Sequence, residues 1–126
     1  MKTSCFSNYN GDKGVAICIY PPSNWTGASF QDLCPDKSDF YLIRSGNMTN
    51  KEYEKSYRKK VLSKLNPQEV YDKLKDSVLL CWEKSEEFCH RRIVAAWIKE
   101  ELGIEVPEWS KNDDKNFTSS QSEPLF

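Results

Sequence analysis

The chain has 126 residues, 18 basic and 19 acidic side chains, one histidine and five cysteines, a length that fits one domain. Its formal net charge of −1 argues against the broad basic surface of nucleic-acid binders, so a nucleic-acid partner is not favoured. Without a membrane-length apolar run or the apolar core of a secretory signal, the chain is expected in the cytoplasm with no membrane partner.

The N-terminal half contains one strong strand signal. The run at 15–20 is apolar throughout, which is typical of a buried strand, and Pro21 ends it. Polar loops flank this run at 8–11 and 23–27. A short helix is predicted at 37–44, between a proline and a glycine.

Two helix starts follow in the middle of the chain. Thr49 and Glu52 have the spacing of a capping box, and apolar residues at helical spacing follow them. Asn66 before Pro67 is a second start signal, which predicts a short helix ending near 76–77.

The C-terminal third predicts a buried strand and a helix. The run at 78–82 is apolar without alternation, as in a strand covered on both faces. After a polar loop at 83–87, a helix is predicted from about Phe88, with Gly103 just beyond its end. Residues 104–106 alternate like a short strand.

This order of elements predicts an α/β layer fold with a mostly parallel sheet. We expect one domain over residues 1–109. Residues 110–126 are polar, and we expect a disordered tail there.

The five cysteines, at positions 5, 18, 34, 81 and 89, form no C-x-x-C pair. A secreted disulfide scaffold favours an even, denser pattern, so reduced thiols are expected. Cys18 and Cys81 lie in predicted buried strands, where a cysteine packs as a small apolar residue. Only Cys89 is expected to carry chemistry.

The segment 83–91 is the strongest candidate site. It joins a predicted buried strand to a helix, and ligands of open α/β sheets bind outside the carboxyl ends of the strands. A helix N-terminus at that place attracts anions. The only histidine, His90, lies there between Cys89 and Arg91.

Three interpretations of this segment stay open. Cys89 is a thiol nucleophile with His90 as base, although adjacent helical residues point about 100° apart and need not touch. Alternatively, His90 and Arg91 bind a phosphate or carboxylate while Cys89 packs. In the third interpretation all three are structural, and the arginines pair with acidic residues of 83–87.

A metal site is not expected from the sequence. Cys81, Cys89 and His90 are zinc-type ligands, but no fourth ligand is visible near them. We therefore expect no metal and no cofactor.

The segment 51–64 carries six basic and two acidic side chains. Such a pattern is typical of a solvated helix face. The alternative is a nucleic-acid or protein-interaction module that uses this basic helix.

The C-terminal block resembles the DUF488 family. Leu-Leu-Cys-Trp-Glu-Lys at 79–84 and Phe-Cys-His-Arg at 88–91 match the family's LLCxEK…FCHR signature. The N-terminal half is similar to the short branch of that family, through Ser-Asn-Tyr at 7–9, the loop at 22–27 and the Glu-Tyr helix beginning at 52. The resemblance spans roughly residues 4–109.

The resemblance implies a small Rossmann-like three-layer domain with a mostly parallel sheet and flanking helices, in a family found in bacteria, archaea and phages. It also implies a shared polar cluster of Glu83, Cys89, His90 and Arg91. Relatives often have Ser-Arg after the first strand, where this chain has Cys-Ile-Tyr at 18–20.

We therefore expect a phosphate-bearing small molecule, such as a nucleotide, to bind at the 83–91 turn. Arg91 is expected to contact the anion, His90 to donate or shuttle a proton, and Glu83 to orient one of them or accept a hydrogen bond from a ribose or base.

Further ligand contacts are expected from the loops that flank the first predicted strand, through Asn8, Tyr9 and Trp25. One alternative is an enzyme that uses Cys89 and His90 on a nucleotide or nucleic-acid-derived substrate. The other is the interaction module built on 51–64, with a phage counter-defence role as one form of it.

Overall fold

The computed structural model describes residues 1–83 and 88–111. The strands are β1 (Lys2–Cys5), β2 (Gly14–Ala16), β3 (Ala28–Ser29) and β4 (Val78–Cys81), and the helices are α1 (Lys37–Arg44), α2 (Asn50–Lys60), α3 (Pro67–Leu74) and α4 (His90–Leu102). Two short 3-10 helices, Gln31–Leu33 and Leu62–Lys64, complete the set. Most of the expected tail and of the polar loop, with the acidic residues Glu86 and Glu87, lies outside the described residues.

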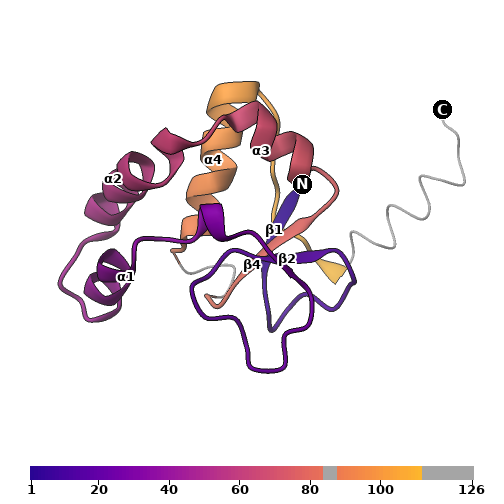
Figure 1. Ribbon diagram of the computed structural model, residues 1–126, viewed down its shortest axis with the longest axis horizontal. Coiled ribbons are helices and arrows are strands. Elements are labelled where there is room, and N and C mark those ends of the chain that lie inside the picture. The colour runs from indigo at the N-terminus through magenta and orange to yellow at the C-terminus, as the bar shows by residue number, and fades with distance from the viewer. Residues whose placement is uncertain (84–87, 112–126) are drawn as a thin grey trace, which may run out of the picture.

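The four strands form one parallel sheet in the order β1-β4-β2-β3 (Figure 1). Leu79 of β4 lies at the centre, opposite Thr3 on one side and Val15 on the other. The expected α/β fold with a parallel sheet is thus confirmed. None of the helices that the structure describes is long and apolar enough to cross a membrane.

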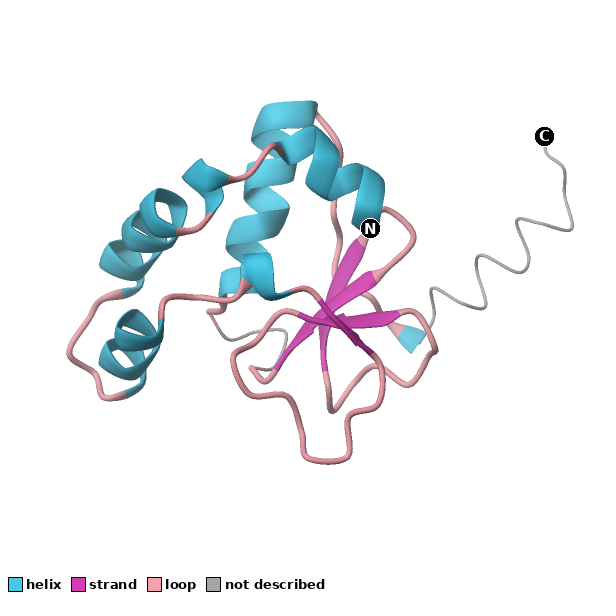
Figure 2. Cartoon of the chain, viewed as in Figure 1, coloured by secondary structure: helices cyan, strands magenta, loops and turns pink. Residues whose placement is uncertain are grey.

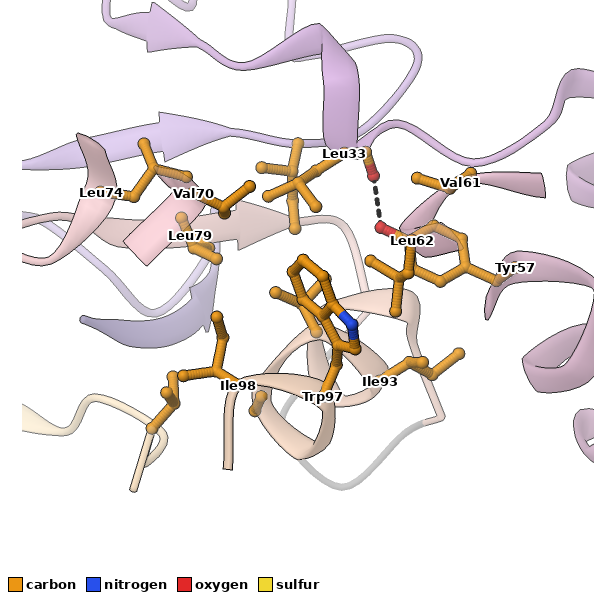
Figure 3. Packing of buried hydrophobic residues seen from close by; sticks show 14 of the residues in the cluster. Leu33, Tyr57, Val61, Leu62, Val70, Leu74, Leu79, Ile93, Trp97 and Ile98 are labelled. Carbon is orange, nitrogen blue, oxygen red and sulfur yellow. Dashed lines mark hydrogen bonds between the residues drawn. The ribbon is translucent and has the colours of Figure 1, made fainter. Parts of the chain in front are cut away.

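Helices cover one face of the sheet (Figures 1 and 2). The main core lies between the sheet and the helices α2, α3 and α4, with Leu79, Val94 and Ile98 fully buried. In its interior the Tyr57 hydroxyl donates a hydrogen bond of 2.6 Å to the Leu33 carbonyl (Figure 3). This bond fixes α2 against the segment that precedes α1.

Aromatic side chains from loops cover the opposite face. Phe6, Tyr9 and Trp25 pack there with Trp109 against Leu80 and its neighbours. Helices, sheet and aromatic loops thus make three layers.

Local sequence signals set the helix boundaries as expected. Thr49 and Glu52 form a complete capping box at the start of α2, and Asn66 caps α3 with Pro67 in its first turn. Gly103 ends α4 in the left-handed conformation, with φ of 73°, where a glycine has no Cβ to clash. The helix predicted at 37–44 is α1, with the same bounds.

The strands differ from the prediction in several places. No sequence pattern predicts β1 or β3, and the strand predicted at 78–82 ends one residue earlier, at Cys81. The strand predicted at 15–20 ends at Ala16: the Ile17 N–H still donates to the Leu80 carbonyl at 3.0 Å, but the Ile17 carbonyl accepts from the His90 ring and not from a strand. The segment 104–106 is not a strand. Pairing with β1 is limited to a bridge between Thr3 and Glu108, since Pro107 has no N–H for a longer ladder.

Candidate functional site

A pocket of about 400 Å³ lies at the carboxyl ends of β2 and β4. Its lining includes Cys18 and Ile19 after β2, Phe40, Ile43 and Arg44 of α1, Asn50 and Tyr53 of α2, Trp82 and Glu83 after β4, and Phe88, Cys89 and His90 at the start of α4. This is the edge at which parallel α/β sheets bind ligands. Three of the predicted site residues, Glu83, Cys89 and His90, therefore share one pocket.

Glu83, Cys89 and His90 also contact one another. Cys89 Sγ lies 3.1 Å from Glu83 Oε1 and 3.6 Å from His90 Nδ1. Glu83 Oε2 lies 3.9 Å from Arg44 Nη1, whose side chain is 57% exposed. The pocket thus has a buried polar floor and an exposed cation on its wall.

The contact between Cys89 and His90 was not required by the sequence, because adjacent helical side chains diverge. Cys89, however, is the N-cap of α4 and has extended backbone angles, φ −157° and ψ 153°. Its side chain is therefore free to turn toward the His90 ring. Cys89 makes no side-chain capping hydrogen bond to the helix.

His90 is buried and neutral in this setting. Its Nε2 lies 2.7 Å from the Ile17 carbonyl, which can only accept, so the proton is assigned to Nε2 and Nδ1 keeps its lone pair. Burial lowers the pKa of His90 to about 4, helped by the Arg91 charge and opposed by the Ile17 hydrogen bond. Nδ1 therefore keeps its lone pair and can accept a hydrogen bond or bind a metal, whereas the Nε2 proton is donated to the backbone.

Cys81 has a larger role than the packing expected for it. Its Sγ atom is paired with Cys89 Sγ as a disulfide, although the two Cα atoms are 7.8 Å apart, so the expectation of reduced thiols is wrong for these two cysteines, while Cys5, Cys18 and Cys34 are free. The sequence predicts only that Cys81 packs as a small apolar residue in a strand. Its contact with Cys89 is not predictable locally, because it depends on where the chain returns after the loop. The two sulfurs and His90 Nδ1 form one buried cluster.

Arg91 lies outside the pocket, in the interior. It is fully buried, and its Nε and Nη2 atoms donate to Glu108 at 3.1 and 3.2 Å. Its Nη1 donates to Cys81 Sγ at 2.8 Å and to the Glu83 carbonyl at 2.7 Å. The expected anion contact therefore has no geometric support, because each guanidinium nitrogen already has a protein acceptor.

Arg92 is also held by the protein. Its Nη1 donates to the Thr3 hydroxyl at 2.8 Å and approaches Glu108 Oε2 at 3.4 Å. The Thr3 hydroxyl in turn donates to Glu108. Within the described residues the acidic partner of both arginines is thus Glu108, and Glu83 meets Arg91 only through its carbonyl. Glu86 and Glu87, which the structural interpretation also named, lie outside the described residues.

Asn8, Tyr9 and Trp25 are not brought to the pocket. Asn8 is exposed in the turn after β1. The Tyr9 ring packs edge-on against Trp109 at 4.9 Å, in a separate hollow at the amino ends of β1 and β4. Trp25 donates to the Ala28 carbonyl and packs against Phe6. The loops that carry them fold back over the sheet, so their expected ligand contacts are without support.

The residues that form the wall of the pocket are not predicted by the sequence. Arg44 and Phe40 belong to α1, and Tyr53 to α2. No local pattern marks them, because their place depends on how α1 and α2 pack over the carboxyl ends of the strands. Trp82 lies inside the signature block. The apolar run that precedes it predicts burial, but Trp82 is 47% exposed.

The basic segment 51–64 is partly neutralised by neighbouring elements. Arg58 pairs with Glu54 and Glu100, at 3.1 and 2.9 Å, and Lys60 pairs with Asp39 at 3.2 Å. These pairs join α2 to α4 and α1. A role of this helix face in binding nucleic acid stays a prediction.

Comparison with known protein families gives a match to the family model DUF488-N3a, described as "Active DUF488-N3 subclade", over residues 13–102. This range runs from the start of β2 to the end of α4 and includes every residue of the pocket lining. No curated protein matches the chain. No solved structure matches it either.

Proposed function

The chain belongs to the DUF488 family, and we propose that it binds a small phosphate-bearing molecule of nucleotide size in the pocket at the carboxyl ends of β2 and β4. The observation that carries this proposal is the combination of one exposed guanidinium, Arg44, with aromatic walls and a buried polar floor. Drug-sized ligands occupy mainly apolar pockets of about 300–1,000 Å³ that hold a few polar groups.

Two positive features of the pocket favour an anion. Arg44 presents its guanidinium from α1, a geometry suited to phosphate oxygens. The N-terminus of α4 also meets the pocket at Cys89 and His90, where the helix dipole is positive. Arg44 takes the role that the sequence gave to Arg91.

The aromatic side chains favour a planar group on the same ligand. A second hollow of about 340 Å³ adjoins the pocket and shares Phe40, Arg44 and Trp82 with it, adding Tyr20 and Tyr41. Trp82 is anchored, because its Nε1 donates to the Tyr20 carbonyl at 2.6 Å, yet its ring is half-exposed. A base that stacks on such a ring gains about 1–3 kcal/mol. Glu83 can accept hydrogen bonds from a ribose or base.

The test is a thermal-shift and calorimetric screen of nucleoside mono-, di- and cyclic phosphates and ADP-ribose derivatives, each against its nucleoside without phosphate. We expect at least one phosphate-bearing member to raise the Tm and its nucleoside to bind more weakly. Arg44→Ala should weaken that binding by about 10- to 100-fold, the loss typical of one charged hydrogen bond.

The matched control is Lys59→Ala, which removes one exposed positive charge of α2 outside the pocket lining and should bind as the wild type does. A panel in which no compound shifts the Tm would contradict the proposal. Equal weakening by Arg44→Ala and Lys59→Ala would instead indicate a general effect of charge. Turnover by Cys89 and His90 stays a prediction.

A further inference from the structure

The geometry points to a zinc site in the floor of the pocket once the Cys81–Cys89 pair is reduced, with Cys81 Sγ, Cys89 Sγ and His90 Nδ1 as its ligands. These three atoms lie within 4.8 Å of one another, and all three residues are buried. Two of them, Cys89 and His90, also line the pocket, so a fourth position is open to water or to a bound molecule. This inference does not depend on the proposed ligand.

The donor set suits zinc better than the other common biological metals. Thiolate sulfur and imidazole nitrogen are its usual ligands, whereas magnesium and calcium prefer oxygen. Two cysteines and one histidine with one open position make a catalytic type of zinc site, and a structural site has four protein ligands. In the sequence, the lack of a fourth protein ligand counts against a structural zinc site. An open zinc site, in contrast, has only three protein ligands and leaves the fourth position to water or substrate.

The hydrogen bond of His90 fits a metal ligand. A ligating histidine almost always donates its second ring N–H to a carbonyl or carboxylate, which fixes the tautomer and aims the other nitrogen at the metal. His90 has this arrangement, with Nε2 at 2.7 Å from the Ile17 carbonyl and Nδ1 on the side of Cys89 Sγ.

The backbone spacing of the two cysteines also favours a metal between them. Their Cα atoms are 7.8 Å apart, beyond the span of about 4.4–6.8 Å that a direct sulfur–sulfur bond prefers. Two thiolates on one tetrahedral zinc ion, each at about 2.3 Å, are held about 3.8 Å apart. The wider backbone span therefore suits a shared metal better than a direct sulfur–sulfur bond.

Arg91 supplies the outer support of the site. Its Nη1 donates to Cys81 Sγ at 2.8 Å, and a guanidinium at this distance stabilises a negatively charged sulfur. Glu108 holds the rest of the guanidinium in place. Such outer hydrogen bonds orient metal ligands and tune their basicity. In the proposed site, the buried Arg91 thus supports the metal ligand Cys81.

The first experiment titrates Co²⁺ into the untagged wild-type protein, reduced and freed of metal. We expect one Co²⁺ per chain, the near-ultraviolet charge-transfer absorption of cobalt–thiolate bonds, and displacement by Zn²⁺. Cys81→Ser should weaken binding by about 100-fold or more, above the 10- to 100-fold cost of losing an outer hydrogen bond. Cys34→Ser is the matched control, because it removes a thiol outside the cluster, and should leave the titration unchanged.

A second measurement needs no substitution and so does not depend on how Cys81→Ser folds. X-ray absorption at the zinc edge of the loaded wild-type protein should give two sulfur ligands at about 2.3 Å together with nitrogen or oxygen ligands at about 2.0 Å. A wild-type protein without the charge-transfer band overturns the inference. A ligand shell without sulfur overturns it, as does a band that Cys34→Ser removes.

Discussion

His90 and Arg91 are neighbours in the sequence, yet they belong to two regions with different surroundings. The pocket cluster, which we define as Arg44, Glu83, Cys89 and His90, surrounds a pocket that opens at the sheet edge. The clamp, which we define as Thr3, Arg91, Arg92 and Glu108, ties β1 and α4 to the segment after α4. One turn of helix thus divides the Cys-His-Arg segment at 89–91 between the pocket and the protein interior.

The comparison teaches that adjacent polar residues of a motif need not act on the same ligand. Arg91 has the charge of an anion-binding residue, but it is fully buried and has protein acceptors. Arg44, far away in the sequence, is exposed on the pocket wall. If the division is real, substitutions in the clamp should change stability, and substitutions in the pocket cluster should change binding.

The largest expected effect is on the clamp. Glu108→Ala removes the carboxylate that holds the buried Arg91 guanidinium, and losing one partner of a buried pair costs about 3–5 kcal/mol. Because the Glu108 side chain is 24% exposed, we expect the lower end, about 3 kcal/mol of the free energy of unfolding. Urea denaturation monitored by tryptophan fluorescence measures it.

Glu105→Ala is the matched control for that substitution. Glu105 pairs with Lys99 on the surface, where both side chains are mostly exposed, and such pairs contribute about 0–1 kcal/mol. Equal losses of stability in the two variants would refute the distinction between the clamp and the surface.

The second prediction concerns Tyr57, which packs beside the pocket cluster. Its ring packs against His90 with the centroids 5.5 Å apart, and its hydroxyl donates to the Leu33 carbonyl. Tyr57→Phe leaves that carbonyl without its donor, so we expect a loss of about 1–3 kcal/mol in the free energy of unfolding. Tyr71→Phe is the control, since Tyr71 is only partly buried at the edge of the core; a Tyr57 variant that unfolds at the same urea concentration would contradict the prediction.

The smallest expected change in stability is at the pocket wall. Arg44 is mostly exposed, and its contact with Glu83 is long at 3.9 Å. Arg44→Ala should therefore change the free energy of unfolding by less than about 0.5 kcal/mol, in contrast to its effect on ligand binding. A loss comparable with that of Glu108→Ala would show that Arg44 belongs to the stabilising framework.

Most of the helix boundaries could be predicted from the sequence, because the signals that set them are local. Thr49 with Glu52, Asn66 with Pro67, and Gly103 act within one turn of chain. The family block also brought Glu83, Cys89 and His90 together correctly, since one short segment contains all three.

Long-range partners escaped prediction for physical reasons. Strand β1 has the sequence Lys-Thr-Ser-Cys, which is polar and does not predict a buried strand. Thr3 and Ser4 are nevertheless buried, because the folded chain provides their hydrogen-bond partners. The partner of Arg91 is Glu108, beyond the whole of α4. The exposure of Arg44 and the displacement of Tyr9 and Trp25 from the pocket follow from packing between elements, which no periodicity encodes.

The N-cap of α4 has a consequence for how this domain could be made more stable. Cys89 occupies a position where serine, threonine, aspartate or asparagine would accept a hydrogen bond from the first turn, yet it makes none. A serine there would stabilise the helix by about 1 kcal/mol. The domain thus lacks part of the stability that a capping residue would add, at the position where its sulfur meets the pocket. In the reduced, metal-free protein, a Cys89→Ser variant should therefore melt at a higher temperature than the wild type, while it loses one of the two sulfurs proposed to bind zinc.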